Sequence, residues 1–550
     1  MKKVKFPHVG VPLMIIGALI IGLILGNHLP GRHIIKNAGA QKISEILNLI
    51  ETDYVDAVNL DSLLDESIPS ILANLDPHTA YIPAKDFDEV NSELEGSFSG
   101  IGIQFQMMND TITVLEVISG GPSEKIGLRA GDRIIKVNDS IVAGVKMKND
   151  SILKMLRGPK DSTVKLAIKR TGSEAPLTYT VTRGDIPVTS IDASYMIEPE
   201  IGYIKVNKFG RNTFREFFTE MMMLRADGAK SYILDLRGNS GGYLDVAIRM
   251  ANEFLGTGEE IVSTRGRNGE LESRVLADGT GSFKGAKLTI LLDEFSASAS
   301  EIVAGAMQDN DRATIVGRRS FGKGLVQKQH DLSDGSAIRV TTARYYTPSG
   351  RCIQKPFTKG DVNNYQLEIY DRYLSGEAFS ADSVKPDQSL LFHTAAGREV
   401  YGGGGIMPDI FVPTDTANIN SYVNQVFNAG LLHRFSFEYA DQHRQLFDNA
   451  ESADEVIAML PSDGSLLGDF VQFAAKNGVP ARWYYINNSR PLLVNQLKAL
   501  IARDALGTAA YYEIANTRDK VVLRAIESLK NKSQWTNRKF AGKYATANNS

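Results

Sequence analysis

Short apolar runs alternate with stretches of helical spacing through the middle of this 550-residue chain. Residues 201–206, 231–236 and 287–292 have the length and composition of buried parallel strands, and residues 336–346 predict a longer strand. Apolar residues at helical spacing follow at 213–224, 243–255 and 299–307. Strands that alternate with helices of about ten residues predict an α/β layer fold with some parallel pairing.

The regions on either side of this core have different patterns. Residues 31–93 and 416–550 carry apolar positions at helical spacing, whereas 94–183 combines alternating strands with glycine-rich turns. A chain of this length is too long for one core. We predict a leading segment 1–30, a helical region 31–93, a β-rich domain 94–183, an α/β core 184–415 with a polar insertion at 357–395, and a helical tail 416–550 that packs or oligomerises.

The N-terminus carries a candidate membrane anchor. Lys2, Lys3 and Lys5 precede an apolar run over residues 9–26. As a helix rising about 1.5 Å per residue, this run would span roughly 27 Å, enough for the hydrocarbon core of a membrane. A signal peptide is the alternative, although the cleavage-like Ala38-Gly-Ala40 lies far beyond the run. Because the basic residues precede the span, we predict an inner-membrane anchor with the remaining chain in the cell envelope, on the periplasmic side.

Composition excludes several kinds of function. A net charge of -3 argues against nucleic acid as the main partner. Cys352 is the single cysteine, so an intrachain disulfide and a cysteine-based zinc site are both excluded. The eight histidines have no metal-ligand spacing, so we predict neither a metal nor another cofactor.

Candidate chemistry begins where the 287–292 strand meets the 299–307 helix. Ser298 lies in this junction, where α/β folds display nucleophiles and where a helix N-terminus favours negative charge. Ser298-Ala-Ser-Glu301 also matches a capping box, so this serine could simply be a helix cap. Ser296 and Ser300 are equally available by composition, and spacing alone does not choose among the three.

Lys323 is the candidate base nearest in sequence. A free lysine has a pKa near 10.4, so only about one molecule in 10³ is neutral at pH 7, and a basic lysine must be buried or lie near another cation. Phe321, Leu325 and Val326 could supply apolar walls, and Gln327 could orient the amine.

A phosphate-binding loop is the alternative interpretation of Lys323. Residues 317–323 fit the first positions of that pattern, and they follow a strand. However, Gly324 stands where the magnesium-binding Ser or Thr belongs, and the following residues are extended in pattern instead of helical. The interpretation of the chain as a nucleoside triphosphatase is therefore disfavoured.

A glycine-rich turn follows the 231–236 strand. Asp235-Leu-Arg237-Gly-Asn-Ser-Gly241-Gly242 opens the next helix and would aim backbone N–H groups into a cleft. Such groups can hold a phosphate or an oxyanion, or the glycines can serve only the turn itself. His78, in a capped turn ahead of the β-rich domain, is interpreted as structural.

The β-rich domain resembles a PDZ domain, on the run Gly127-Leu-Arg-Ala-Gly131-Asp132-Arg-Ile. In that fold a glycine-rich loop binds a terminal carboxylate, and the peptide adds a strand beside a helix. The predicted carboxylate loop consists of Ser99, Gly100, Ile101, Gly102 and Ile103. Ile152 and Met155 are predicted to line the groove. The alternative is that the glycines serve only as tight-turn residues and bind no peptide.

Together these motifs resemble the carboxyl-terminal processing peptidases, a family of Ser/Lys endopeptidases with an embedded PDZ domain. The resemblance covers about residues 75–413 and rests on Leu-Asp-Pro-His-Thr79, the PDZ run, the 235–242 turn, Ser-Ala-Ser298-Ala-Ser-Glu-Ile, Phe-Gly-Lys323-Gly-x-x-Gln327, Tyr-Tyr-Thr-Pro-Ser-Gly350 and Gly-Ile-Met-Pro-Asp409. It implies a crotonase-like α/β peptidase core with an inserted PDZ domain, an N-terminal helical region and a C-terminal helical tail.

The same resemblance assigns roles at the site. It implies Ser298 as the nucleophile, Lys323 as the general base and Gln327 as the residue that orients the lysine. It implies that the N–H groups of Gly242 and Ala299 form the oxyanion hole. The implied function is cleavage of proteins at or near their C-termini, with peptide segments as partners and a homo-oligomer possible. A catalytically silent PDZ adaptor on a hydrolase scaffold is the alternative, which the intact Ser298, Lys323 and Gln327 disfavour.

Overall fold

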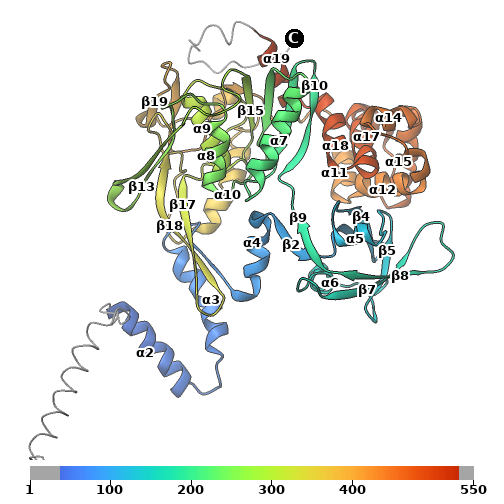
Figure 1. Cartoon of the computed structure of the whole chain (residues 1–550), viewed down its shortest axis with the longest axis horizontal. Helices are drawn as coiled ribbons and strands as arrows, with labels where there is room; N and C mark the ends of the chain where they lie inside the picture. Colours follow the sequence, from blue (N-terminus) through green and yellow to red (C-terminus); the bar gives the residue numbers. More distant parts are fainter. Residues whose placement is uncertain (1–37, 532–550) are drawn as a thin grey trace, which may run out of the picture. The chain divides into compact units, whose positions relative to one another are not determined.

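The computed structural model describes residues 38–531 (Figure 1), and the chain divides into two compact units between Ile71 and Leu72. The first unit contains α2 (Ala38–Asp53) and most of α3 (Leu60–Ala73). The predicted helical pattern is thus confirmed there. Within residues 38–531 no helix is long and apolar enough to cross a membrane. The apolar run at 9–26 lies outside the described residues, so the anchor stays a prediction.

The second unit is built on a six-stranded sheet in the order β10-β11-β12-β15-β16-β21. β10 is antiparallel to β11, and the other neighbours run parallel. Three of these strands are the predicted apolar runs, and they are parallel because helices cross over between them. The strands are β10 (Ile191–Glu198), β11 (Ile201–Val206), β12 (Ser231–Asp235), β15 (Lys287–Leu292), β16 (Thr314–Gly317) and β21 (Ile410–Phe411).

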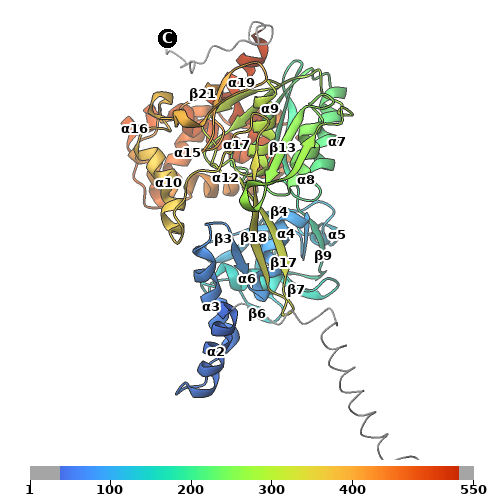
Figure 2. The same ribbon diagram turned by 90° about the vertical axis from the view of Figure 1, so that its left-hand side faces the viewer.

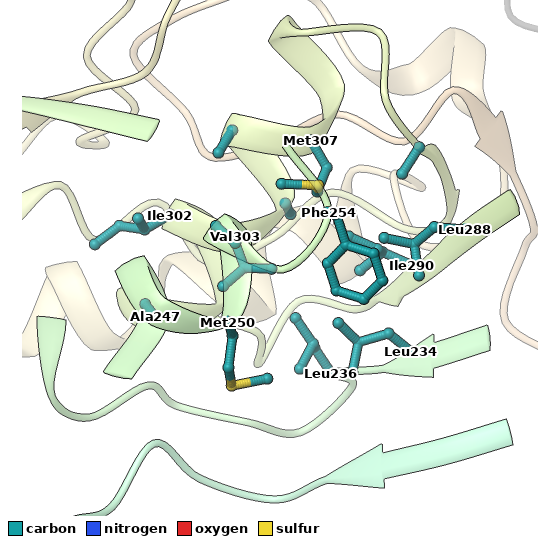
Figure 3. Packing of buried hydrophobic residues seen from close by; sticks show 14 of the residues in the cluster. Leu234, Leu236, Ala247, Met250, Phe254, Leu288, Ile290, Ile302, Val303 and Met307 are labelled. Atoms are coloured by element: carbon teal, nitrogen blue, oxygen red, sulfur yellow. The ribbon is translucent and has the colours of Figure 1, made fainter. Parts of the chain in front are cut away.

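The main hydrophobic core lies between this sheet and the helices α7 (Thr213–Ala226), α8 (Leu244–Asn252) and α9 (Ala299–Asp309). Every residue of α9 is buried, because the helix runs between the sheet and its neighbours. Figure 3 shows Met250 of α8 and Val303 of α9 gathered in one cluster with Leu236. The three helices match the predicted ones, and they fix the strand ends that carry the site.

A second sheet was predicted only in part. Its long strand β18 pairs with β1, β13 and β17, and β13 pairs with β14. Figure 2 shows β17 and β18 as a long hairpin. The bounds are β1 (Ala80–Ile82), β13 (Glu260–Arg265), η2 (Arg267–Gly269), β14 (Leu271–Leu276), β17 (Leu325–Asp331) and β18 (Ala337–Tyr346).

The β-rich domain leaves the core through η1 (Ala84–Asp86) and α4 (Phe87–Glu95). Its entering and leaving strands pair with each other, β2 with β9, so the domain is an insertion with its two ends joined. Its main sheet has the order β3-β4-β5-β7-β8, with β6 on β5. The bounds are β2 (Ser97–Gly100), β3 (Ile103–Met108), β4 (Thr111–Val117), α5 (Pro122–Lys125), β5 (Arg133–Val137), β6 (Ser140–Ile141), α6 (Asn149–Leu156), β7 (Thr163–Lys169), β8 (Leu177–Thr182) and β9 (Gly184–Pro187).

The polar stretch 357–395 has secondary structure of its own. It contains α10 (Val362–Leu374), η3 (Ala381–Ser383), η4 (Gln388–Leu390) and β19 (Leu391–His393), which pairs with β20 (Glu399–Tyr401). Tyr365 and Arg372 of α10 are buried against the core. The side chains that α10 buries are a tyrosine and an arginine, so the helix has no clear apolar face. The pattern of apolar residues therefore did not predict α10.

The C-terminal tail is helical, as predicted. A bundle with its own core is followed by a last helix, α19, that packs on the central sheet. The bounds are α11 (Ser421–Asn428), α12 (Leu431–Gln442), α13 (Arg444–Phe447), α14 (Ala453–Met459), α15 (Asp463–Lys476), α16 (Trp483–Asn488), α17 (Arg490–Leu506), α18 (Thr508–Ala515), η5 (Asn516–Arg518) and α19 (Lys520–Lys530). The predicted fold class, an α/β core with an inserted β-rich domain and a helical tail, is confirmed.

Candidate active site

A cleft of about 680 Å³ gathers the candidate residues of the α/β core. Its walls come from the glycine-rich turn after β12, the start of α9, β17 and α4. Ser298, Gly242 and the pair Lys323 and Gln327, predicted from three separate motifs, all line it.

Ser298 has an unusual backbone for a residue with a side chain. Its φ of 56° and ψ of -113° lie in a region that side chains rarely occupy, at the N-cap of α9. Such strain persists only where surrounding structure imposes it, and it is typical of a sharp strand-to-helix turn that exposes a nucleophile. Ser298 is the N-cap of α9, and the Glu301 side chain accepts from its backbone N–H as in the predicted capping box, but its positive φ is unusual for an ordinary helix cap.

The three serines of the junction have different environments. Ser296 and Ser300 are fully buried, and their hydroxyls donate to the carbonyls of Leu236 and Asn239, each at 2.9 Å. Ser298 is only partly buried and faces the cleft. The flanking serines thus tie the α9 loop to the glycine-rich turn, and only the middle one is open to a ligand.

The glycine-rich turn approaches Ser298 closely. A Cβ on Gly241 would lie 2.7 Å from the Ser298 Cβ, and one on Gly242 would lie 2.2 Å from the Phe209 carbonyl oxygen. Gly242 also has a φ of 148°, so a side chain there is excluded by strain and by space. Ala299 is the first residue of α9, where N–H groups have no partner within the helix. Within residues 38–531, neither the Gly242 nor the Ala299 N–H donates to a backbone carbonyl outside the regular elements.

Lys323 is followed by a strand, β17, and no helix begins there. The phosphate-loop interpretation fails for this reason, as its sequence context indicated. The Lys323 ammonium contacts Gln327 Oε1 at 3.2 Å, and the Gln327 amide donates to the backbone carbonyl of His78. Gln327 therefore holds the Lys323 side chain. Gln327 is in turn held by His78, which precedes the β-rich domain in the sequence, whereas Gln327 follows that domain.

One carboxylate joins the serine loop to the lysine loop. Glu301 is fully buried, and its Oε2 accepts from the backbone N–H of Ser298 at 2.8 Å and of Lys323 at 2.9 Å. Its Oε1 accepts from the Gly322 N–H at 2.7 Å and from the Ser320 hydroxyl at 2.5 Å. Since two loops donate to the same oxygen atom, Glu301 sets their separation.

The pKa of the Glu301 carboxyl is raised above its ordinary value, because burial outweighs the hydrogen bonds that the group accepts. Burial raises the pKa of its carboxyl, and the hydrogen bonds from Ser320, Lys323, Ser298 and Gly322 act in the opposite direction. Three of the four donors are backbone N–H groups, which cannot accept a proton. The geometry therefore requires an acceptor at both oxygens.

The electrostatics around Lys323 favour its neutral form. Burial lowers the pKa of the Lys323 ammonium, and the positive charge of Arg339 lowers it further, whereas Glu301 and Asp76 oppose the shift. Arg339 lines the same cleft, where it donates to Gln329 Oε1 at 3.0 Å and to Asn91 Oδ1 at 2.8 Å. Leu325 and Val326 also line the cleft, as predicted for the apolar walls.

Three supporting residues were not identified as such from the sequence. Asp76 accepts from the N–H groups of His78 and Thr79, both at 2.8 Å, and from the Thr341 hydroxyl at 3.1 Å, so it fixes the 75–79 turn on β18. Burial lowers the pKa of His78 to about 4, and its ring contacts the Tyr365 hydroxyl at 2.9 Å. The backbone carbonyl of His78 is what holds Gln327, and the structural role predicted for its ring stays a prediction.

The third supporting residue is Tyr345, whose hydroxyl donates to the Lys323 carbonyl. Burial raises the pKa of Tyr345 well above its ordinary value, so the phenol stays protonated and remains a donor. Tyr345 is the first residue of the Tyr-Tyr-Thr-Pro-Ser-Gly350 motif, but the motif alone does not indicate which group its hydroxyl contacts.

The predicted peptide groove lies in the β-rich domain. Ser99 and Gly100 end β2, and Ile101 and Gly102 lead into β3, which begins at Ile103 and is the edge strand of its sheet. An edge strand can accept a further strand from a peptide. Met155 is half-buried on α6, but Ile152 is fully buried in the domain core, so it offers no exposed surface in this structure. The peptide-binding roles of these residues stay predictions.

Three family profiles match the chain. The profile of peptidase family S41 matches residues 200–363, and the PDZ domain profile matches residues 99–181. Residues 422–507, within the helical tail, match a family of unknown function. The sequence similarity thus defines the class as a PDZ-containing peptidase of the serine type.

Known proteins extend this similarity. The carboxy-terminal-processing protease of Bartonella bacilliformis is 38% identical over 378 residues, which cover 68% of this chain and 84% of that protein. The carboxy-terminal processing protease CtpA of Bacillus subtilis is 33% identical over 363 residues, covering 64% of this chain and 75% of that protein. The solved photosystem II D1 C-terminal processing protease is 29% identical, covers 57% of this chain and 83% of that chain, and has a TM-score of 0.34.

The chain belongs to peptidase family S41, and it carries a PDZ domain. The resemblance to the carboxyl-terminal processing peptidases is confirmed by relatives that bear this name.

The link made by Glu301 gives a testable prediction. Glu301→Gln keeps the shape but turns an NH2 group toward donors, so peptidase turnover is expected to fall at least about tenfold, and the free energy of unfolding by about 1–3 kcal/mol. Peptide hydrolysis and denaturant unfolding would measure the two effects. Glu294→Gln, which removes only the ion pair with Arg318 before the same loop, is the control. Wild-type turnover in Glu301→Gln would show that the carboxylate does not set the loop geometry.

Proposed function

We propose that the chain is a serine endopeptidase with Ser298 as the nucleophile and Lys323 as the general base. The observation that carries the proposal is the shared cleft, in which Ser298 at positive φ and half-buried Lys323 face the same space. Glu301 supports the proposal further, because its one oxygen binds the backbone of both residues.

Neutral Lys323 takes the proton from Ser298 as the serine oxygen attacks a peptide carbonyl. The lysine then gives this proton to the leaving amine, and water hydrolyses the acyl-enzyme. The lowered pKa of Lys323, caused by burial and by Arg339, supports this role because a base must be neutral to accept a proton. Gln327 Oε1 orients the amine.

The oxyanion that forms on the carbonyl is stabilised by the N–H groups of Gly242 and Ala299. Both belong to segments that meet at Ser298, and Ala299 adds the positive end of the α9 helix. Loss of one such donor typically costs about 10²–10³ in turnover.

Substrate recognition is assigned to the PDZ domain. We propose that it binds C-terminal segments of proteins through Ser99, Gly100, Ile101, Gly102 and Ile103, with Met155 on the helix beside the groove. The open edge of β3 supports this role, and relatives are named for carboxy-terminal processing. A silent PDZ adaptor would show peptide binding without proteolysis.

The location is proposed to be the cell envelope, with an anchor in the inner membrane. The support is the lysine-flanked apolar run at 9–26. A cleaved signal peptide would give the same side of the membrane without the anchor.

Removal of either catalytic group tests the dyad. Ser298→Ala and Lys323→Ala are each expected to lower cleavage of an unfolded test protein by roughly 10⁴-fold or more, because nucleophile and base act as a unit. Ser452→Ala removes a serine that caps α14, and Lys328→Ala removes an exposed lysine on β17, so both controls should stay active. Near-normal turnover in a folded Ser298→Ala or Lys323→Ala protein would refute the assignment.

The charge of Arg339 predicts a shift in the pH profile. Arg339→Gln removes a cation that lowers the pKa of Lys323, so that pKa rises and the lysine becomes neutral only at higher pH. The acid limb of kcat/KM should therefore move to higher pH. Arg344→Gln, on the same strand, should leave it in place. An unmoved or acid-shifted limb would mean that Lys323 is not the titrating base.

Topology can be tested in cells. Protease added to spheroplasts is expected to reach the chain after residue 30, because the predicted span places that part outside the cytoplasm. Digestion of the epitope-tagged C-terminus, with a cytoplasmic protein as the protection control, measures this. Full protection of the tag would overturn the envelope location.

A further inference from the structure

The last helix of the chain belongs to the peptidase core. α19 packs its apolar side on the face of the central sheet opposite α7, α8 and α9, against Leu291, Val316 and Ile410. The residues of α19 in this contact are Val521, Val522, Ala525, Ile526 and Leu529. The segment lies well beyond residues 200–363, which match the peptidase family.

The N-cap of this helix is ion-paired to the glycine-rich turn. Asp519 Oδ1 accepts from the N–H groups of Val521 at 2.8 Å and Val522 at 3.2 Å. Asp519 Oδ2 accepts from Arg237 Nη1 at 2.7 Å. One carboxylate therefore joins the start of α19 to the first side chain of the turn that leads to Gly242.

Arg237 is held from several sides in a cluster of balanced charge. The guanidinium Nε contacts both oxygens of Asp235, at 3.0 and 3.1 Å, and Asp235 is fully buried. The Lys205 ammonium donates to the Arg237 carbonyl and lies 3.5 Å from Asp235. Two cations, Lys205 and Arg237, thus face two carboxylates, Asp235 and Asp519. Without Asp519 the cluster has one positive charge in excess, beside the fully buried Asp235.

The position of Arg237 matters because its neighbours hold the serine loop. The Leu236 carbonyl accepts from Ser296 Oγ at 2.9 Å, and the Asn239 carbonyl accepts from the Ala297 N–H at 3.0 Å. These acceptors lie on either side of Arg237 and Gly238 in the chain. A shift of Arg237 would therefore move both the Gly242 N–H and the loop that carries Ser298.

We propose that Asp519 is a positioning residue of the peptidase site, which fixes the 237–242 turn through Arg237 and makes α19 a working part of the catalytic core. This inference rests on the proposed dyad and oxyanion hole. The residue contacts no substrate, and it acts only through the geometry of the turn.

Asp519→Asn in the full chain tests the proposal. Asparagine keeps the N-cap hydrogen bonds but lacks the charge, so α19 should stay in place. We expect kcat for an unfolded protein substrate to fall about tenfold, below the roughly 100-fold that a misplacement of 1 Å can cost. KM should not change. The midpoint of thermal unfolding should fall, because the positive charge of Arg237 loses a partner, so turnover is measured at a temperature well below that midpoint. Turnover is expressed per active site, counted by complete labelling with a fluorophosphonate and intact mass.

The matched control is Asp415→Asn, which removes the exposed ion pair with Lys520 at the same end of α19 and should leave kcat unchanged. In an Arg237→Gln background, Asp519→Asn should alter kcat less than twofold, because the two residues act through one contact. Wild-type kcat per active site in Asp519→Asn, or independent effects in the double variant, would overturn the proposal. Activity that survives Ser298→Ala would instead overturn the dyad, so the two failures are distinguishable.

Discussion

The arrangement of the cleft depends on one buried carboxylate, that of Glu301. It lies in the first turn of α9 and accepts hydrogen bonds from both loops that carry the candidate nucleophile and base. A buried polar group is costly unless its hydrogen bonds are complete, and here four donors complete them. The two loops therefore cannot separate cheaply, because parting them would leave the buried Glu301 side chain without hydrogen-bond partners.

The sheet and its helices provide the rigid frame for this carboxylate. α9 is buried along its whole length between β13, β16 and α8, so its N-terminus, and with it Ser298, has a fixed position. The glycine-rich turn follows β12, which pairs with the strand before α9. Lys323 lies in the loop just before β17 and lines the same cleft. Close approach between these segments requires Gly241 and Gly242, where a Cβ has no room. Packing and hydrogen bonding thus specify the same geometry independently.

The strands and helices of the core could be predicted because each has a long apolar signal, as in residues 287–292 and 299–307. α10, β13 and β14 were missed, since polar or exposed residues dominate them. The choice among Ser296, Ser298 and Ser300 could not be made from spacing, because it depends on the carbonyls of Leu236 and Asn239 some sixty positions away. The contribution of His78 is made by a backbone carbonyl, which has no sequence signal at all.

The hydrogen bonds from Gln327 to His78 and from Arg237 to Asp519 join residues 249 and 282 positions apart. Contacts between such distant positions form only when nearly the whole chain is available, and folds rich in them form slowly. A chain still under synthesis would hold Ser298 and Lys323 before α19 exists to cover the second face of their sheet. If Asp519 positions the glycine-rich turn as proposed, the cleft reaches its final geometry only after α19 has been made, although Ser298 and Lys323 are present much earlier.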